Sequence, residues 1–199
     1  MMSVPSAPMA TESTTTVVIG SGLSGLAVAS ELSRQGVHSI VVDGLDFLDA
    51  AEPSRRAKVS DPVAFGERTE ILRLLRHYAQ THGLDVRNST RALELTMVGN
   101  QAGGASRPKK WIIQTADGVL MADSIVLTRC AQNQLRRILA SLGIKISRDI
   151  MNALRALGLY LVGVGDLITP TTKEILHQAK MVSQAISAQS ASAALGALA

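Results

Sequence analysis

The feature that most constrains the fold is an uncharged apolar run at residues 17–19, which meets three glycines spaced as G-x-G-x-x-G. These glycines are Gly20, Gly22 and Gly25. The first allows a tight strand-to-helix turn, the second lets the backbone approach a pyrophosphate, and the third lets the helix pack closely on the strand. The amides of Leu23, Ser24 and Gly25 would then lie at a helix N-terminus. Unpaired N–H groups and the helix dipole attract phosphate there. The pattern predicts a dinucleotide-binding turn.

The residues after the glycines complete a βαβ unit. A helix with apolar residues on one side ends at Gly36, and a second strand at residues 39–42 ends in Asp43. In dinucleotide-binding folds, an acid about 20 residues beyond the glycines accepts the ribose hydroxyls of the adenosine half. We therefore predict that Asp43 binds this ribose. The alternative is an ordinary βαβ unit that happens to have a glycine-rich turn.

Composition limits the class of protein. With 199 residues, of which 46% are apolar, the chain has material for one domain with a substantial core. There are only two Phe, two Tyr and one Trp, so this core must be mainly aliphatic. The single cysteine, Cys130, excludes a disulfide framework or a CxxC redox pair within the chain.

The N-terminal segment and the lack of a long apolar run predict a cytoplasmic protein. Residues 1–15 are rich in Ser, Thr and Pro and are interpreted as a disordered leader, without the basic residues and apolar segment of a signal peptide. No 18-residue apolar run is present, so no membrane span is expected.

The net charge of +4 is concentrated at residues 129–158, where a basic face could dock a partner or simply be solvated. Nucleic acid is not expected as the partner, because no aromatic residues alternate with these cations.

The rest of the chain predicts more alternating elements. A long irregular stretch at residues 44–66 precedes a helix at 67–81 and a short strand at 84–87. Strands at 92–98, 110–115 and 119–122 form an antiparallel meander, and a buried parallel strand follows at 124–128. The predicted fold is α/β, a Rossmann-type parallel sheet with an inserted three-stranded antiparallel meander.

The C-terminal part continues the pattern. Helices are expected at residues 131–142 and 147–156, and a buried strand at 159–164 ends in Gly165 and Asp166. After Pro170 a helix presents an apolar stripe, and the Ala/Ser-rich tail at 189–199 either extends this helix or is disordered. No metal-ligand spacing and no catalytic triad are apparent. The four scattered histidines are interpreted as ordinary surface or core residues.

Taken in order, these elements resemble the FAD-binding domain of two-dinucleotide-domain flavoproteins, in particular flavin-containing monooxygenases and pyridine-nucleotide-dependent flavin oxidoreductases. The resemblance covers roughly residues 16–188, between the leader at 1–15 and the tail at 189–199. It implies that Asp166 holds the ribityl chain of FAD and that the backbone near Ala92 borders the adenine. The full set of cofactor-binding residues predicted is Gly20, Ser21, Gly22, Leu23, Ser24, Gly25, Asp43, Gly44, Ala92, Thr128, Gly165 and Asp166.

The sequence departs from these families at three places, and one is that no Gly-Gly-x-Trp follows Asp43, as it does in many monooxygenases. They carry Ala-Thr-Gly after the meander, where this chain has Thr128, Arg129 and Cys130. They also insert an NADPH domain before the Gly-Asp strand. Here only residues 129–158 are available, too few for a second nucleotide fold.

These features predict an FAD-binding oxidoreductase in a reduced or subunit form. It would take electrons from a small-molecule substrate or from an electron-donor partner protein. The alternatives are NAD in place of FAD, and a non-catalytic dinucleotide-binding module that docks a partner through the basic 129–158 face. Oligomerisation is left open, and no catalytic side chain is assigned.

Overall fold

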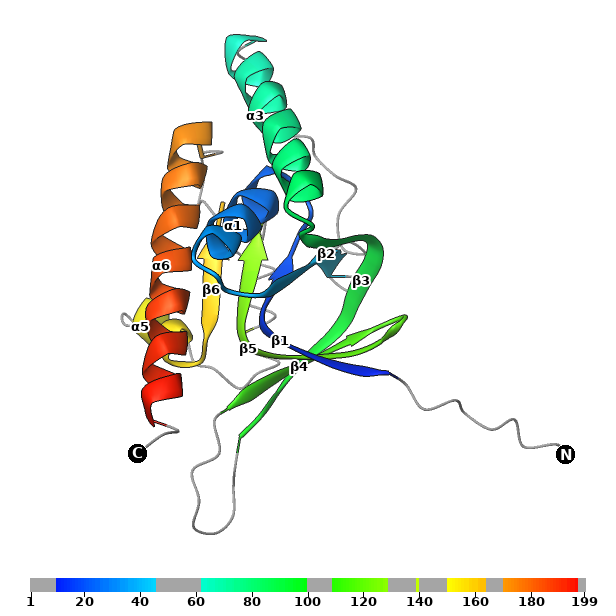
Figure 1. Ribbon diagram of the computed structural model, residues 1–199, viewed down its shortest axis with the longest axis vertical. Helices are drawn as coiled ribbons and strands as arrows, with labels where there is room; N and C mark the ends of the chain where they lie inside the picture. Colours follow the sequence, from blue (N-terminus) through cyan, green and yellow to red (C-terminus); the bar gives the residue numbers. More distant parts are fainter. Residues whose placement is uncertain are drawn as a thin grey trace, which may run out of the picture.

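A computed structural model describes residues 10–45, 62–99, 109–128, 139, 150–163 and 170–196 (Figure 1). The strands are β1 (Thr11–Ile19), β2 (Ser39–Leu45), β3 (Asp85–Val98), β4 (Lys110–Thr115), β5 (Gly118–Thr128) and β6 (Leu159–Val162). The helices are α1 (Leu23–Arg34), α3 (Pro62–Thr81), α5 (Ile150–Ala156) and α6 (Thr172–Gly196).

Within these residues the strands form one sheet whose larger part is parallel. β1 lies between β2 and β5 and is parallel to both, while β3 continues beyond β2 and β6 beyond β5. β4 is antiparallel and pairs with β3 on one side and β5 on the other. The pairings β1–β2–β3–β4–β5–β1 therefore close into a ring, and β6 extends the sheet outside it. The predicted fold class, a Rossmann-type parallel sheet with antiparallel strands added, is confirmed.

The meander is built differently from the prediction. The strands expected at residues 84–87 and 92–98 are parts of one strand, β3, and those expected at 119–122 and 124–128 are parts of β5. Each long strand changes partner along its length, because β5 pairs with β4 through its first half and with β6 through its second half. The meander is thus a continuation of the parallel strands.

Two predicted boundaries are wrong. The expected disordered leader at residues 1–15 overlaps β1, because Thr11–Thr14 pair with the first half of β5, and threonine favours extended backbone. The helix expected from residue 67 begins at Pro62, since proline is well suited to the first turn of a helix. At the other end α6 runs to Gly196, which agrees with the first of the two alternatives for the tail at 189–199, an extension of the helix.

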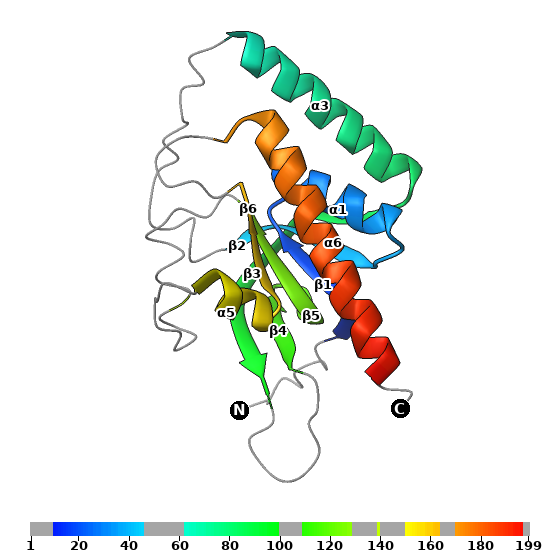
Figure 2. The same cartoon turned by 90° about the vertical axis from the view of Figure 1, so that its left-hand side faces the viewer.

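Apolar side chains fill both faces of the parallel strands. In β1, Val17 and Ile19 face one core with Trp111, whereas Val18 faces a second core with α1 and α6. This alternation follows from the two-residue period of a strand. Figure 2 shows α1, α3 and α6 gathered on one face, and α5 contributes Leu154 to the core on the other. No helix in the described part of the chain has the apolar length that a membrane span requires.

Candidate nucleotide-binding site

The glycine-rich segment forms a tight turn between β1 and α1. Gly20 has a φ of 117°, which favours glycine, and its amide donates a hydrogen bond to the carbonyl of Val42 on β2 (2.8 Å). The amide of Leu26 donates to the carbonyl of Gly22 (3.0 Å), which begins the helical hydrogen bonding of α1. The turn therefore lies at the carboxyl end of β1, the edge of a parallel sheet at which α/β proteins bind nucleotides.

Close packing leaves no room for side chains at two of the glycines. A Cβ on Gly25 would overlap the carbonyl oxygen of Gly20, and a Cβ on Gly20 would overlap the hydroxyl oxygen of Thr128. That hydroxyl donates a hydrogen bond to the carbonyl of Ile19 (2.8 Å), so the end of β5 holds the turn in place. Gly25 thus has the packing role that the sequence predicted for it.

The first turn of α1 is arranged to receive an anion. Gly22 is the N-cap residue and makes no side-chain capping bond, and the first turn contains no acidic residue. The first amides of an α-helix have no partner within the helix, so those of Leu23, Ser24 and Gly25 are available by geometry. Together with the helix dipole they favour a phosphate group at this position.

Asp43 lies beside the turn, as predicted. It stands near the carboxyl end of β2, and its Oδ1 accepts a hydrogen bond from the hydroxyl of Ser21 (2.7 Å). Its Oδ2 lies 3.7 Å from Nε of Arg91 on β3. The Asp43 side chain is still 35% exposed, so a ligand can reach the carboxylate.

The remaining predicted residues divide into two groups. Gly44 is paired with Arg91, and Ala92, which is fully buried, is paired with Leu45, so both lie where β2 and β3 run together near Asp43. Gly165 and Asp166 lie outside the described residues, and the ribityl-binding role expected of Asp166 stays a prediction.

Sequence reasoning missed a contact at the end of β6. Gly163 has a φ of 71°, and its amide donates a hydrogen bond to Oε1 of Gln178 on α6 (2.9 Å). A Cβ on Gly163 would lie only 2.6 Å from the hydroxyl oxygen of Ser24 in the first turn of α1. The end of β6 thus reaches the turn from the side opposite Asp43. The signal for this contact in the sequence was Gly163 itself, two residues before Gly165.

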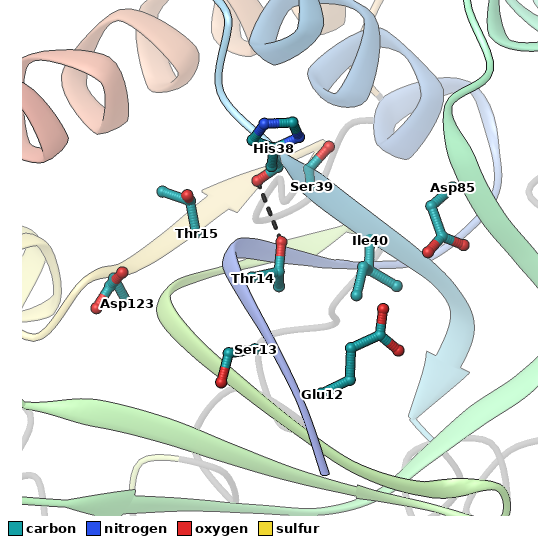
Figure 3. A pocket seen from close by; sticks show the side chains of 9 residues that line it. All are labelled: Glu12, Ser13, Thr14, Thr15, His38, Ser39, Ile40, Asp85 and Asp123. Carbon is teal, nitrogen blue, oxygen red and sulfur yellow. Dashed lines mark hydrogen bonds between the residues drawn. The ribbon is translucent and has the colours of Figure 1, made fainter. Parts of the chain in front are cut away.

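A polar groove of about 390 Å³ lies at the opposite edge of the sheet (Figure 3). Its lining residues come from β1, from the residue before β2, from the starts of β2 and β3, and from β5; they are Glu12, Ser13, Thr14, Thr15, His38, Ser39, Ile40, Asp85 and Asp123. Arg87 bridges Asp85 and Glu12 (2.6 and 2.8 Å), and these hydrogen bonds raise the pKa of its guanidinium. Because the groove lies at the amino ends of β2 and β3, it is separate from the glycine turn.

In the described ranges no three His, Cys, Asp or Glu side chains gather in a way that could hold a metal ion. Cys130 and most of the basic 129–158 segment lie outside those ranges. No catalytic residue is therefore assigned.

Comparison with known proteins agrees with this geometry. Residues 13–65 match a family described as FAD binding domain, and this segment includes most of β1, the glycine turn, α1 and β2 with Asp43. The resemblance to FAD-binding domains is confirmed. No curated protein matches the chain.

Two solved structures share the fold of this chain. The bacillithiol disulfide reductase of Staphylococcus aureus aligns with a TM-score of 0.59 at 13% identity, over 89% of this chain and 99% of that one. THI4 of Thermovibrio ammonificans aligns with a TM-score of 0.57 at 17% identity, over 89% and 90%. A thioredoxin reductase from Gloeobacter violaceus aligns with a TM-score of 0.40 at 18% identity, over 60% of this chain. The chain spans only 35% of that reductase's length.

Proposed function

We propose that the chain binds FAD at the carboxyl end of β1 and serves as an oxidoreductase. The observation that carries the proposal is the glycine turn, in which a helix N-terminus without its own capping side chain lies beside an accessible carboxylate. The match of residues 13–65 to FAD binding domains supports FAD over NAD.

The residues present fit such a cofactor. The amides of Leu23, Ser24 and Gly25 would hold the pyrophosphate, and the closeness of Gly25 to Gly20 keeps this turn compact. Asp43 would accept hydrogen bonds from the adenosine ribose, and the β3 backbone at Ala92 would border the adenine. By resemblance, Gly165 and Asp166 would hold the ribityl chain.

The chain's own contribution is to bind and orient. A flavin, when bound, supplies the electron-transfer chemistry, so the protein needs few reactive side chains of its own. In our proposal the electrons come from a small-molecule substrate or from a donor protein in the cytoplasm. The second candidate is a non-catalytic module that docks its partner through the basic 129–158 face, on which Arg155 of α5 is exposed.

An absorbance spectrum tests the proposal directly. Purified protein is measured before and after incubation with excess FAD followed by desalting, and flavin bands at roughly 370 and 450 nm are expected to remain with the protein. A flat spectrum from folded protein would contradict FAD binding, and calorimetry with NAD would then test the other dinucleotide.

Activity is tested separately from binding. Anaerobic mixing of the FAD-loaded protein with candidate reductants is expected to bleach the band at roughly 450 nm. Retained flavin that no reductant bleaches, together with a stable complex with another protein, would favour the docking module.

A further inference from the structure

Arg91 on β3 belongs to the same cluster as the acid that the sequence singled out. Its Nε lies 3.7 Å from Oδ2 of Asp43, while the other carboxylate oxygen accepts the hydrogen bond from Ser21. Three segments that are distant in the sequence therefore meet at one carboxylate: the glycine turn, the end of β2 and the middle of β3. The pairing of Gly44 with Arg91 brings β3 to this place.

These two contacts fix the direction in which the carboxylate points. A carboxylate can accept about four hydrogen bonds, so lone pairs remain on both oxygens beside the hydrogen bond from Ser21 and the ion pair with Arg91. The Asp43 side chain is 35% exposed and that of Arg91 is 43% exposed, so the pair is open to a ligand. Asp43 is thus oriented in advance, which lowers the entropy lost when a ligand binds.

The positive charge of Arg91 has a second effect, on the electrostatic repulsion between Asp43 and a bound pyrophosphate. A pyrophosphate at the first turn of α1 would be repelled by the carboxylate of Asp43, which is tied to that turn through Ser21. A guanidinium beside the carboxylate offsets this repulsion and remains charged at every physiological pH. The carboxylate of Asp43 would repel a phosphate on the 2′-oxygen of the ribose, and Arg91 is already paired with that carboxylate. The Asp43–Arg91 pair therefore disfavours a ribose that carries a 2′-phosphate.

We propose that Arg91 is a positioning residue of the adenosine site, which holds Asp43 toward the ribose and offsets its charge against the pyrophosphate. The inference rests on the proposed function, since it concerns the same dinucleotide site. The ligand class it defines is an adenosine diphosphate group with an unphosphorylated ribose, as in FAD.

Calorimetric titration of the flavin-free protein with FAD and with ADP tests this role. Arg91→Gln is expected to weaken both ligands by about 3- to 5-fold, the upper part of the range for an ion pair between partly exposed side chains. Arg91→Lys is expected to recover most of the affinity because it keeps the charge. The matched control is Arg73→Gln, which breaks an exposed ion pair with Glu70 on α3 and is expected to change neither affinity.

A double-mutant cycle shows whether Arg91 acts through Asp43. Asp43→Asn weakens both ligands, and adding Arg91→Gln to it is expected to cost less than about a further 2-fold, because the carboxylate that Arg91 positions is gone. Independent effects that multiply would overturn the proposal. The melting temperature of each variant is measured first, and Arg91→Met replaces Arg91→Gln if the latter does not fold.

The outcomes separate the two proposals. If the unaltered protein binds neither FAD nor ADP, the proposed function fails. If it binds both and Asp43→Asn weakens them while Arg91→Gln does not, only the role of Arg91 is overturned. An equal loss in Arg91→Gln and Arg73→Gln also overturns it, as does 2′,5′-ADP binding as tightly as AMP, which differs from it only in lacking the 2′-phosphate.

Discussion

At the scale of single residues, the turn depends on contacts that tolerate no added atom. Gly25 in α1 faces the carbonyl of Gly20, and Gly20 in turn faces the hydroxyl of Thr128 at the end of β5. Both positions therefore require glycine because a Cβ has no space there, and Gly20 requires it also because its φ is positive. The same atoms that make the turn compact also place the helix N-terminus where a phosphate could bind.

Gly25→Ala is expected to lower the free energy of unfolding by about 1–3 kcal/mol or more, because the new methyl group must push α1 away from the turn. It is also expected to reduce FAD retention. Urea unfolding and the absorbance spectrum measure the two effects.

Gly66→Ala is the matched control. Gly66 lies in α3 with no atom within 4 Å of an added Cβ, and alanine there is expected to stabilise the helix by about 0.5–1 kcal/mol. Equal stability of Gly25→Ala and the unaltered protein would contradict the packing argument.

At the scale of elements, α6 shows how a helix is both started and anchored. The predicted apolar stripe is confirmed, since Ile175, Ala179 and Ile186 are fully buried against α1 and the sheet. At its start, the amide and the hydroxyl of Thr171 both donate hydrogen bonds to Oε2 of Glu174 (2.7 and 3.0 Å). The Glu174 amide donates back to the hydroxyl (3.3 Å), which completes a capping box.

Thr171→Ala is expected to cost about 0.5–2 kcal/mol of stability at pH 7, measured by urea unfolding, because an N-cap hydroxyl is lost. Ser192→Ala, at an exposed position in the same helix, is the control and is expected to change little. If both variants unfold alike, the cap makes no contribution.

The same cap predicts a pH dependence. The hydrogen bonds from the Thr171 amide and hydroxyl lower the pKa of Glu174 from 4.5. A lowered pKa stabilises the fold above the unfolded value of 4.5, and this contribution is lost as the pH falls through the lower folded value. Thr171→Ala loses the hydroxyl bond but keeps the amide bond, so its difference from the unaltered protein is expected to shrink by the hydroxyl's part between pH 5 and roughly pH 3. A constant difference would contradict it.

At the scale of the whole molecule, the closed ring of strands joins the two cores into one unit. β1 and β5 supply side chains to both cores. Trp111 on β4 is 1% exposed and lies in the same core as Val17 and Ile19. Its Nε1 donates a hydrogen bond to the carbonyl of Leu157 (2.8 Å), which ties β4 to the segment between α5 and β6. Disrupting either core is therefore expected to unfold the other.

Trp111→Phe is expected to lower the free energy of unfolding by about 1–3 kcal/mol, because the fully buried side chain becomes smaller and the part-buried carbonyl of Leu157 loses its donor. Circular dichroism during urea unfolding measures the loss. Tyr78→Phe, which keeps a half-buried ring packed on His82, is the control and is expected to change stability by less than about 0.5 kcal/mol.

The single tryptophan also reports on cooperativity. Trp111 fluorescence follows one core, and the helical circular dichroism signal follows α1, α3 and α6 on the other face. Coincident transitions are expected if the ring unites them. Helical signal that disappears at a clearly lower urea concentration would show two independent units.

The sequence by itself determined the local part of this protein. The turn at Gly20–Gly25, the position of Asp43 and the apolar stripe of α6 follow from backbone and periodicity rules that act within about 20 residues. Only the tertiary structure decided that Arg91 meets Asp43, that Gly163 meets Ser24, and that residues 11–14 form a strand. These contacts depend on the register between strands and on the packing of distant segments, which no spacing within one segment encodes.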